Sequence, residues 1–220
     1  MKKPYLFFAF IVLSILFFFQ AEIFAWEKAK EEKGITIYTR KIEGSNFIEL
    51  KAVMRVKTSL ASLVALFEDI ESGPSWIETF KEAKLLERIS QTETYTYSVN
   101  AAPWPIKDRD AIVHNIIKQD PNSNAIIITA TGVPDFIPEK PNLVRIKNIN
   151  AYWKFTPLED GYVEIDYRVH NDPGGHLPSW IINYATIFYP YNSMLNLKEI
   201  IKKPKYQHVQ YDFISKEVSK

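Results

Sequence analysis

Most of the chain after Gly34 is a succession of short segments in which apolar and polar residues alternate, and this pattern constrains the fold more than any other feature. A period of two is typical of β-strands that turn one face to a core. We expect strands at residues 35–40, 47–56, 83–89, 92–100, 110–118, 125–131, 143–149, 152–156 and 162–170. Turn-forming residues separate them, as at Asp120-Pro121-Asn122 and Glu159-Asp160-Gly161. Because the connections are short, neighbouring strands should pair antiparallel.

Beyond residue 172 the alternation gives way to a helical pattern. Apolar residues spaced by three and four form a stripe of Leu177, Ile181, Tyr184, Phe188, Tyr191 and Leu195. The stripe predicts one long helix over residues 178–202, interrupted by a kink or hinge at Pro190 and ended by Pro204. Two shorter helices are expected, one over residues 26–33 and one that Thr58 or Ser59 caps and that runs to about Glu68.

These elements predict a single α+β domain. A sheet with one apolar face must cover that face, and the helix over residues 178–202 is the only predicted element long enough to do so. A curved antiparallel sheet wrapped around this C-terminal helix makes a cup. Any volume that the side chains leave unfilled becomes a hydrophobic cavity, with Tyr184, Phe188 and Tyr191 facing the sheet.

The N-terminal residues 1–25 read as a secretory signal peptide. Lys2 and Lys3 precede an apolar run over residues 6–19, and Ala25 is a suitable small residue for cleavage. We therefore expect an exported protein, periplasmic or secreted, whose domain covers residues 26–220. Ile23 is large for its position before the cleavage site, so an uncleaved leader that anchors the protein in the membrane is the alternative.

Charge and cysteine content exclude several classes of function. The chain has 27 Lys and Arg against 26 Asp and Glu, and removal of Lys2, Lys3 and Glu22 with the leader leaves 25 against 25. A neutral domain has no global field to attract nucleic acid, so no nucleic-acid partner is expected. Without cysteine there is neither a disulfide framework nor a thiolate nucleophile. The four histidines have no metal-ligand spacing, and we expect no metal and no cofactor.

Several stretches, taken in order, resemble the START (steroidogenic acute regulatory protein-related lipid transfer) family. They are Gly34-Ile-Thr-Ile-Tyr-Thr-Arg40, Trp76 after a helix, Pro103-Trp-Pro-Ile-Lys-Asp-Arg-Asp110, Val144-Arg145 followed by Trp153-Lys-Phe-Thr-Pro157, and Asp172-Pro-Gly-Gly-His-Leu-Pro-Ser-Trp-Ile-Ile-Asn183. The resemblance covers roughly residues 26–202. It implies a helix-grip fold around a tunnel for one lipid, sterol or similar molecule, without chemistry in most members.

The resemblance also implies a gate at the tunnel mouth. The matching loop is about residues 132–142, with Phe136-Ile137-Pro138 at its tip. Some family members carry a buried ionic pair in the tunnel, and the matching positions here are Asn115 and Ser98. Neutral hydrogen-bonding groups would suit a neutral polar head such as a hydroxyl.

The candidate ligand-binding residues combine these arguments with strand alternation. They are Trp76, Tyr97, Ser98, Arg109, Val113, Asn115, Phe136, Tyr167, Ile181, Tyr184 and Phe188. For Asn115 the alternative is an amide satisfied by neighbouring backbone, and Arg109 is expected to be structural, paired with a carboxylate at the rim. Alternation places Tyr97 inward whereas the resemblance places Ser98 inward, and the sequence leaves this open.

The function expected is reversible carriage of one hydrophobic ligand, such as a lipid, by a monomer that touches membranes transiently. An enzyme that acts on a hydrophobic substrate in the same cavity is the first alternative, although no nucleophile elbow supports it. An interaction module with a filled core is the second.

Overall fold

The computed structural model describes residues 25–175 and 179–215, so nearly all of the expected leader lies outside the described residues. The strands are β1 (Glu27–Glu32), β2 (Ile35–Lys41), β3 (Ile48–Lys57), β4 (Phe80–Ser90), β5 (Glu93–Asn100), β6 (Arg109–Gln119), β7 (Ile126–Gly132), β8 (Val144–Arg145), β9 (Asn148–Pro157) and β10 (Tyr162–Asp172). The helices are α2 (Leu60–Glu68) and α3 (Ser179–Ile200), with short 3₁₀ turns η1 (Ile70–Ser75), η2 (Glu159–Gly161) and η3 (Pro204–Tyr206).

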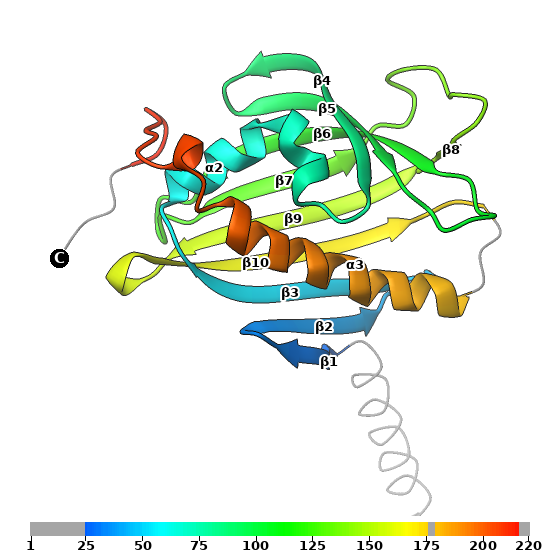
Figure 1. Cartoon of the computed structure of the whole chain (residues 1–220), viewed down its shortest axis with the longest axis horizontal. Coiled ribbons are helices and arrows are strands. Elements are labelled where there is room, and N and C mark those ends of the chain that lie inside the picture. The colour runs from blue at the N-terminus through cyan, green and yellow to red at the C-terminus, as the bar shows by residue number, and fades with distance from the viewer. Residues whose placement is uncertain (1–24, 176–178, 216–220) are drawn as a thin grey trace, which may run out of the picture.

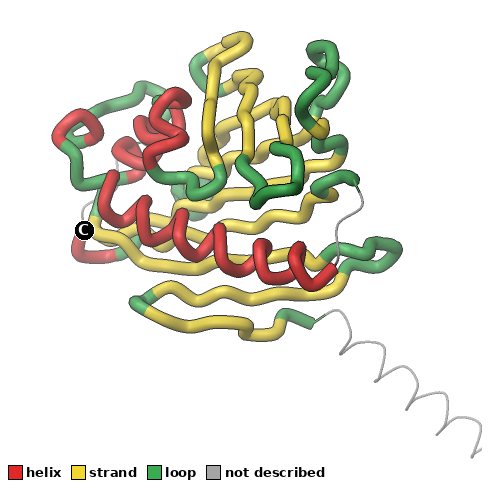
Figure 2. The backbone as a smooth tube through the Cα atoms, turned by 45° about the vertical axis from the view of Figure 1, so that its right-hand side comes forward, coloured by secondary structure: helices red, strands yellow, loops and turns green. Residues whose placement is uncertain are grey.

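A curved ten-stranded sheet with a C-terminal helix confirms the predicted α+β architecture (Figure 1). The strand order is β1-β2-β3-β10-β9-β7-β6-β5-β4 with antiparallel neighbours, and β8 adds to β6 in parallel. The helix α3 crosses one face of this sheet, while α2 and η1 lie beside it on the same face (Figures 1 and 2). The fold is therefore one layer of sheet covered by one layer of helices.

The main core lies where the second half of α3 and α2 meet the middle of the sheet. Met194 and Leu197 of α3 and Leu63 of α2 are buried against strand residues such as Leu50 and Phe155. The cap predicted for α2 is present, because the Ser59 side chain accepts a hydrogen bond of 3.0 Å from the Ser62 amide. Such a cap stabilises a helix by about 1 kcal/mol.

The first described element is a strand, not the helix predicted over residues 26–33. Its side chains are mostly exposed, so no apolar stripe would hold it as a helix against the core. Lys33 and Gly34 both adopt positive φ angles, of 51° and 70°, which suits the two-residue turn of a β-hairpin. The turn returns the chain onto β2, and pairing with β2 overrides the local helical tendency of β1, which becomes the edge strand of the sheet.

The two strands predicted at residues 143–149 and 152–156 have other bounds in the structure. The first is the two-residue strand β8, and the second is the long strand β9. β8 ends at Arg145, and β9 runs without a break through the residues between the two predicted segments. Asn150 pairs with Thr131 of β7 and with His170 of β10. Pairing on both sides keeps the backbone extended here, although the sequence between the two predicted segments favours a turn.

The buried face of α3 differs from the predicted stripe. Tyr184 is 61% exposed and Phe188 39% exposed, and their rings stack on each other with centroids 5.2 Å apart. Tyr191 is buried as expected, together with Met194 and Leu197. Toward the sheet the helix also presents the small residues Ala185, Thr186 and Ser193. Small inward residues leave space between helix and sheet, and this space is the cavity described next.

Candidate functional site

A cavity of about 680 Å³ lies between the sheet and the layer of α3, α2 and η1. The wall is formed by strands β4, β5, β6, β7, β9 and β10, by the loop between β5 and β6, and by α3 from Ile181 to Met194. Nine of the eleven candidate residues border it: Trp76, Tyr97, Ser98, Arg109, Val113, Asn115, Tyr167, Ile181 and Tyr184. Phe136 and Phe188 are not among the lining residues.

Aromatic rings form the end of the cavity near α2. Trp76 and Trp153 lie edge to face with centroids 6.2 Å apart, and Phe67 contacts both rings. The ring of Tyr167 stacks on Trp153 at 3.8 Å, and burial raises the pKa of its phenol. This end offers a ligand apolar surface and almost no polar partner.

The wall formed by β5 and β6 carries a small set of polar groups. The Asn115 amide nitrogen donates to Thr96 Oγ1 at 3.0 Å and to the Val113 carbonyl at 3.3 Å, which matches the alternative reading of this residue. The Asn100 amide donates to Ser98 Oγ at 3.2 Å. These groups hold one another in place, and the oxygens of Asn115 and Ser98 have lone pairs beyond the bonds described.

The structure resolves which face of β5 turns to the cavity. Thr96, Ser98 and Asn100 line it, as the family resemblance implies for Ser98. Tyr97 borders the cavity but packs in a second apolar cluster with Val99 and Ile112. The loop that follows β7 covers this cluster, so apolar alternation along β5 marks a second buried face.

That loop, residues 133–143, does not lie at the cavity, and the gate predicted there is wrong. None of its residues lines the cavity, and Phe136 stacks on Tyr95 on the other side of β5 with centroids 4.4 Å apart. Val133, Ile137 and Leu143 pack on the second cluster. The apolar tip is therefore explained by packing against the outer face of the sheet.

Arg109 differs from its prediction as well. Its side chain is only 7% exposed and borders the cavity, but it pairs with no carboxylate in the described part of the chain. The guanidinium donates to the carbonyls of Lys107 and Gly174 instead. The two adjacent carboxylates are engaged elsewhere, Asp108 by Lys81 and Asp110 by Arg145.

The loop between β5 and β6, which was not among the sequence predictions for the site, lines the cavity. Ala101, Ala102, Pro103 and Ile106 of the β5–β6 loop line the cavity beside the first turns of α3. Trp104 stands at the tip of this loop with 93% of its surface exposed. A tryptophan between two prolines in a loop was the available signal. Tyr184 and Phe188 of α3 are exposed as well, so the loop and the helix that line the cavity both carry exposed aromatic side chains.

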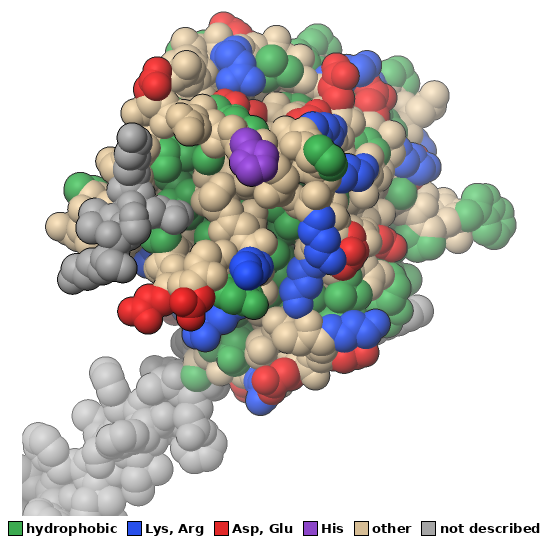
Figure 3. Space-filling view, turned by 60° about the vertical axis from the view of Figure 1, so that its left-hand side comes forward, with side chains coloured by type: hydrophobic (Ala, Val, Ile, Leu, Met, Phe, Trp, Pro, Cys, Tyr) green, Lys and Arg blue, Asp and Glu red, His purple; other side chains and the backbone are tan. Residues whose placement is uncertain are grey.

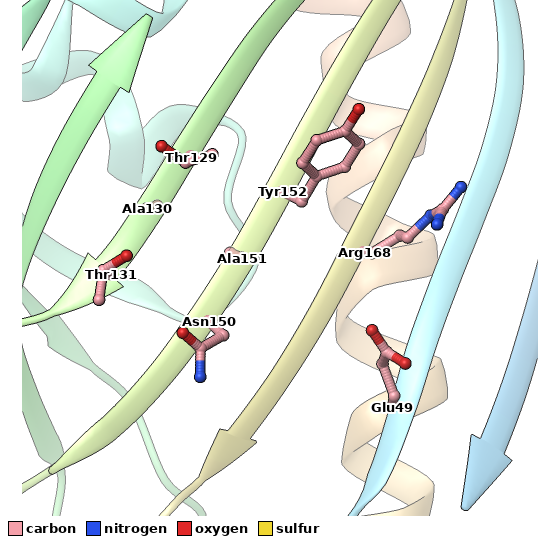
Figure 4. A pocket seen from close by; sticks show the side chains of 8 residues that line it. All are labelled: Glu49, Thr129, Ala130, Thr131, Asn150, Ala151, Tyr152 and Arg168. Atoms are coloured by element: carbon pink, nitrogen blue, oxygen red, sulfur yellow. The ribbon is translucent and has the colours of Figure 1, made fainter. Parts of the chain in front are cut away.

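A second, shallow depression of about 330 Å³ lies on the opposite face of the sheet (Figure 4). Thr129, Asn150 and Tyr152 line it, with Glu49 and Arg168 at its edge, and α3 lies behind the strands in this view. Its charges are satisfied internally, because Arg168 bonds Asp166 twice and Glu49 bonds Arg40. It offers a ligand far less apolar surface than the cavity does.

The described residues lack both a metal-binding cluster and a membrane-spanning helix. No group of three or more acidic or histidine side chains in residues 25–175 and 179–215 could hold a metal ion. Within the same ranges, no helix combines the length and the apolar character needed to cross a bilayer.

Known proteins resemble the chain in sequence and in structure. A family model described as the START domain matches residues 20–186. An uncharacterized protein of Pseudomonas aeruginosa is 30% identical, covering 81% of this chain and 87% of the relative. The phosphatidylcholine transfer protein of Bos taurus is 26% identical, covering 73% and 76%. A crystal structure of a STAR-related lipid transfer protein from Xanthomonas axonopodis superposes with a TM-score of 0.76 at 31% identity, covering 81% of this chain and 99% of that one.

Proposed function

Because this chain belongs to the START domain family, we propose that it binds one hydrophobic molecule in its cavity and carries it between membranes. Lipid binding and transfer is the general activity that its named relatives indicate. The proposal narrows this to a single cargo held between α3 and the sheet.

The observation that carries the proposal is the cavity itself. Its volume of about 680 Å³ falls within the range of small-molecule sites, about 300–1,000 Å³, and its lining is largely apolar. Transfer of an apolar ligand from water into such a site is favourable by about 25 cal/mol per Å² of surface buried. A carrier needs no further driving force to hold its cargo.

The polar side chains of the cavity wall are bonded to one another, which suits a carrier that binds its ligand without reacting with it. Ser98, Asn100 and Thr79 are joined to one another by hydrogen bonds, and Asn115 is bonded to Thr96. Catalysis would call for a base or nucleophile in reach of the ligand. The only carboxylate among the described lining residues is Asp69, which Lys205 and Tyr206 engage.

Transient membrane contact is proposed through the aromatic surface at the opening. Trp104, Tyr184 and Phe188 are exposed, and tryptophan and tyrosine favour the boundary between water and lipid. The β5–β6 loop and the start of α3 would then serve as the gate. Acidic and basic side chains are interspersed on the face seen in Figure 3, as expected for a carrier that meets membranes weakly and leaves them again.

We further propose that the carrier is monomeric and acts after export, outside the cytoplasm. The expected leader at residues 1–25 supports export. A carrier that moves between two membranes through an aqueous compartment must shield its cargo completely, which one closed cavity in a monomer achieves.

The test combines native mass spectrometry with a transfer assay. Protein expressed from the full chain and purified without detergent should retain a copurifying small molecule, and it should speed the movement of a fluorescent lipid between donor and acceptor vesicles. A protein that carries no small molecule and leaves the transfer rate unchanged would contradict carriage. Turnover of the retained molecule would favour the enzymatic alternative.

A further inference from the structure

Within residues 25–175 and 179–215, one cation borders the cavity without a counter-ion. Arg109 begins β6, where it pairs with Asn100 at the end of β5, and its side chain is 93% buried. Asn171 and Pro173 of the β10 end and Ile181 of α3 line the same end of the cavity. Arg109 therefore stands at the opposite end from the aromatic group around Trp76.

Nearby carboxylates do not neutralise Arg109. Asp108 Oδ2 accepts from Lys81 at 2.5 Å and Asp108 Oδ1 from the Ala102 amide at 3.0 Å. Both oxygens of Asp110 accept from Arg145. The Asp172 carboxylate accepts from the Gly174 amide at 2.9 Å and forms no ion pair within the described residues.

The contacts that Arg109 does make leave much of its capacity unused. A guanidinium has five N–H donors, and among the described residues those of Arg109 reach only the carbonyls of Lys107 and, at 3.5 Å, of Gly174. Hydrogen bonds to two backbone carbonyls require N–H donors but no positive charge, so these contacts do not explain why the residue is an arginine. A buried charge without a partner is costly, and burial lowers the pKa of this guanidinium. An anion brought by the ligand would offset that cost.

Resting on the proposed function, we propose that Arg109 binds the anionic head group of the cargo, a carboxylate or a phosphate, while the apolar tail lies along Trp76 and Trp153. Bidentate pairing with such oxyanions is what a guanidinium does best. The head group should carry net negative charge, because a choline or ammonium group beside Arg109 would find no carboxylate. Among the described lining residues only Asp69 could supply one, and it lies at the other end and is already bonded.

Four amphiphiles with the same oleoyl or oleyl chain test this assignment. Oleic acid and oleoyl lysophosphatidic acid carry anionic heads, oleyl alcohol is neutral, and oleoyl lysophosphatidylcholine is zwitterionic. Trp76 and Trp153 line the cavity, so tryptophan fluorescence reports binding of each. At about pH 8, where carboxylates are ionised, the wild-type protein should bind the anionic compounds about tenfold or more tighter than the alcohol. The tighter of the two anionic compounds tells a carboxylate from a phosphate cargo.

Arg109→Gln should remove that preference while leaving affinity for oleyl alcohol within about twofold, and Arg109→Lys should keep part of it. Arg168→Gln is the matched control, because it removes the same charge from the opposite face of the sheet and should change nothing. Equal wild-type binding of oleic acid and oleyl alcohol overturns the assignment even if Arg109→Gln fails to fold, and so does an unchanged preference in that variant. If none of the four compounds binds, the proposed carriage fails with it, whereas binding regardless of head group overturns only the role of Arg109.

Discussion

Arg145 and Asp110 form a buried two-bond ion pair beneath the loop over residues 133–143, with Nε–Oδ1 and Nη2–Oδ2 both at 2.9 Å. Each side chain is only 1% exposed. Arg145 also donates to the carbonyls of Pro134, Ile137 and Pro138, so one guanidinium holds a whole loop on the outer face of β5 and β6. The pKa of Arg145 is raised by the hydrogen bonds that it donates to the Asp110 carboxylate.

Breaking this pair should destabilise the protein strongly. Asp110→Asn leaves the Arg145 charge buried without a counter-ion, so the free energy of unfolding should fall by about 3–5 kcal/mol. Urea denaturation measures the loss, and limited proteolysis should show cleavage within residues 133–143. Glu164→Gln, which breaks the exposed pair with Arg55, is the control and should cost less than about 1 kcal/mol. A loss as small as the control's would mean that the loop does not depend on the pair.

Trp104 should matter for membrane contact and not for stability. The side chain is 93% exposed, so Trp104→Ser should leave the melting temperature nearly unchanged. It should weaken binding to vesicles and slow lipid transfer several-fold, because an aromatic anchor at the opening is lost. Ile89→Ser in β4 removes a 53% exposed apolar side chain that does not line the cavity, and it should leave transfer intact. Equal transfer by both variants would contradict docking through the β5–β6 loop.

How far the sequence could predict this molecule depends on where the deciding contact lies. Strands, the Ser59 cap and the C-terminal helix follow from local patterns, and the structure confirms them. The helix predicted over residues 26–33 is wrong because pairing with β2 decides its conformation, and that partner is not visible in a local pattern. The break predicted within β9 is absent for the same reason, because pairing with β7 and β10 decides the conformation there.

The site was predictable in its chemistry and less so in its geometry. The inward faces of β5 and β6 followed from the resemblance, which named Ser98 and Asn115. A period of two could not select between Tyr97 and Ser98, because a loop buries the outer face of β5 as well. The apolar stripe of α3 misled for a related reason: small residues such as Ala185 and Thr186 face the hollow, while Phe188 does not line it and Tyr184 borders it with most of its surface exposed. The missing counter-ion of Arg109 depends on contacts that the linear sequence does not reveal.

Filling the cavity should block the ligand at little cost in stability. Val113 lines the hollow, so Val113→Phe extends into open space and should change the free energy of unfolding by less than about 1 kcal/mol while weakening ligand binding at least tenfold. Its neighbour Ile112 is fully buried on the opposite face of β6, and Ile112→Phe should cost about 1–3 kcal/mol by overpacking. Denaturation and the fluorescence titration measure both quantities. Comparable destabilisation by the two changes would mean that the space near Val113 is already filled.

Asp69 should make the attachment of the C-terminal strap, residues 204–215, sensitive to acid. Its carboxylate accepts from Lys205 at 2.5 Å and from the Tyr206 hydroxyl at 2.8 Å, which joins the end of α2 to the strap. Burial alone would raise the pKa of Asp69, but the hydrogen bonds from Lys205 and Tyr206 outweigh it and lower the pKa. The Tyr211 hydroxyl donates to Glu68 at 2.7 Å, and the side chains of Tyr211, Phe213 and Ile214 pack on the main core.

A lowered pKa fixes the direction of the pH effect. In the unfolded chain the Asp69 carboxyl titrates at about pH 3.9. The stability that Asp69 contributes is therefore fully present above that pH, and it is lost as the pH falls through the lower pKa of the folded state. Hydrogen exchange of the strap amides, measured at each pH and corrected for the intrinsic exchange rate of an unstructured amide, should therefore become faster below about pH 4. Asp69→Asn should loosen the strap at neutral pH and flatten this dependence, since the group that titrates is gone. Glu199→Gln, in the exposed pair with Lys202, should keep the wild-type pH profile, because neither partner touches the strap's anchor. A wild-type profile in the Asp69 variant would assign the acid sensitivity to another carboxylate.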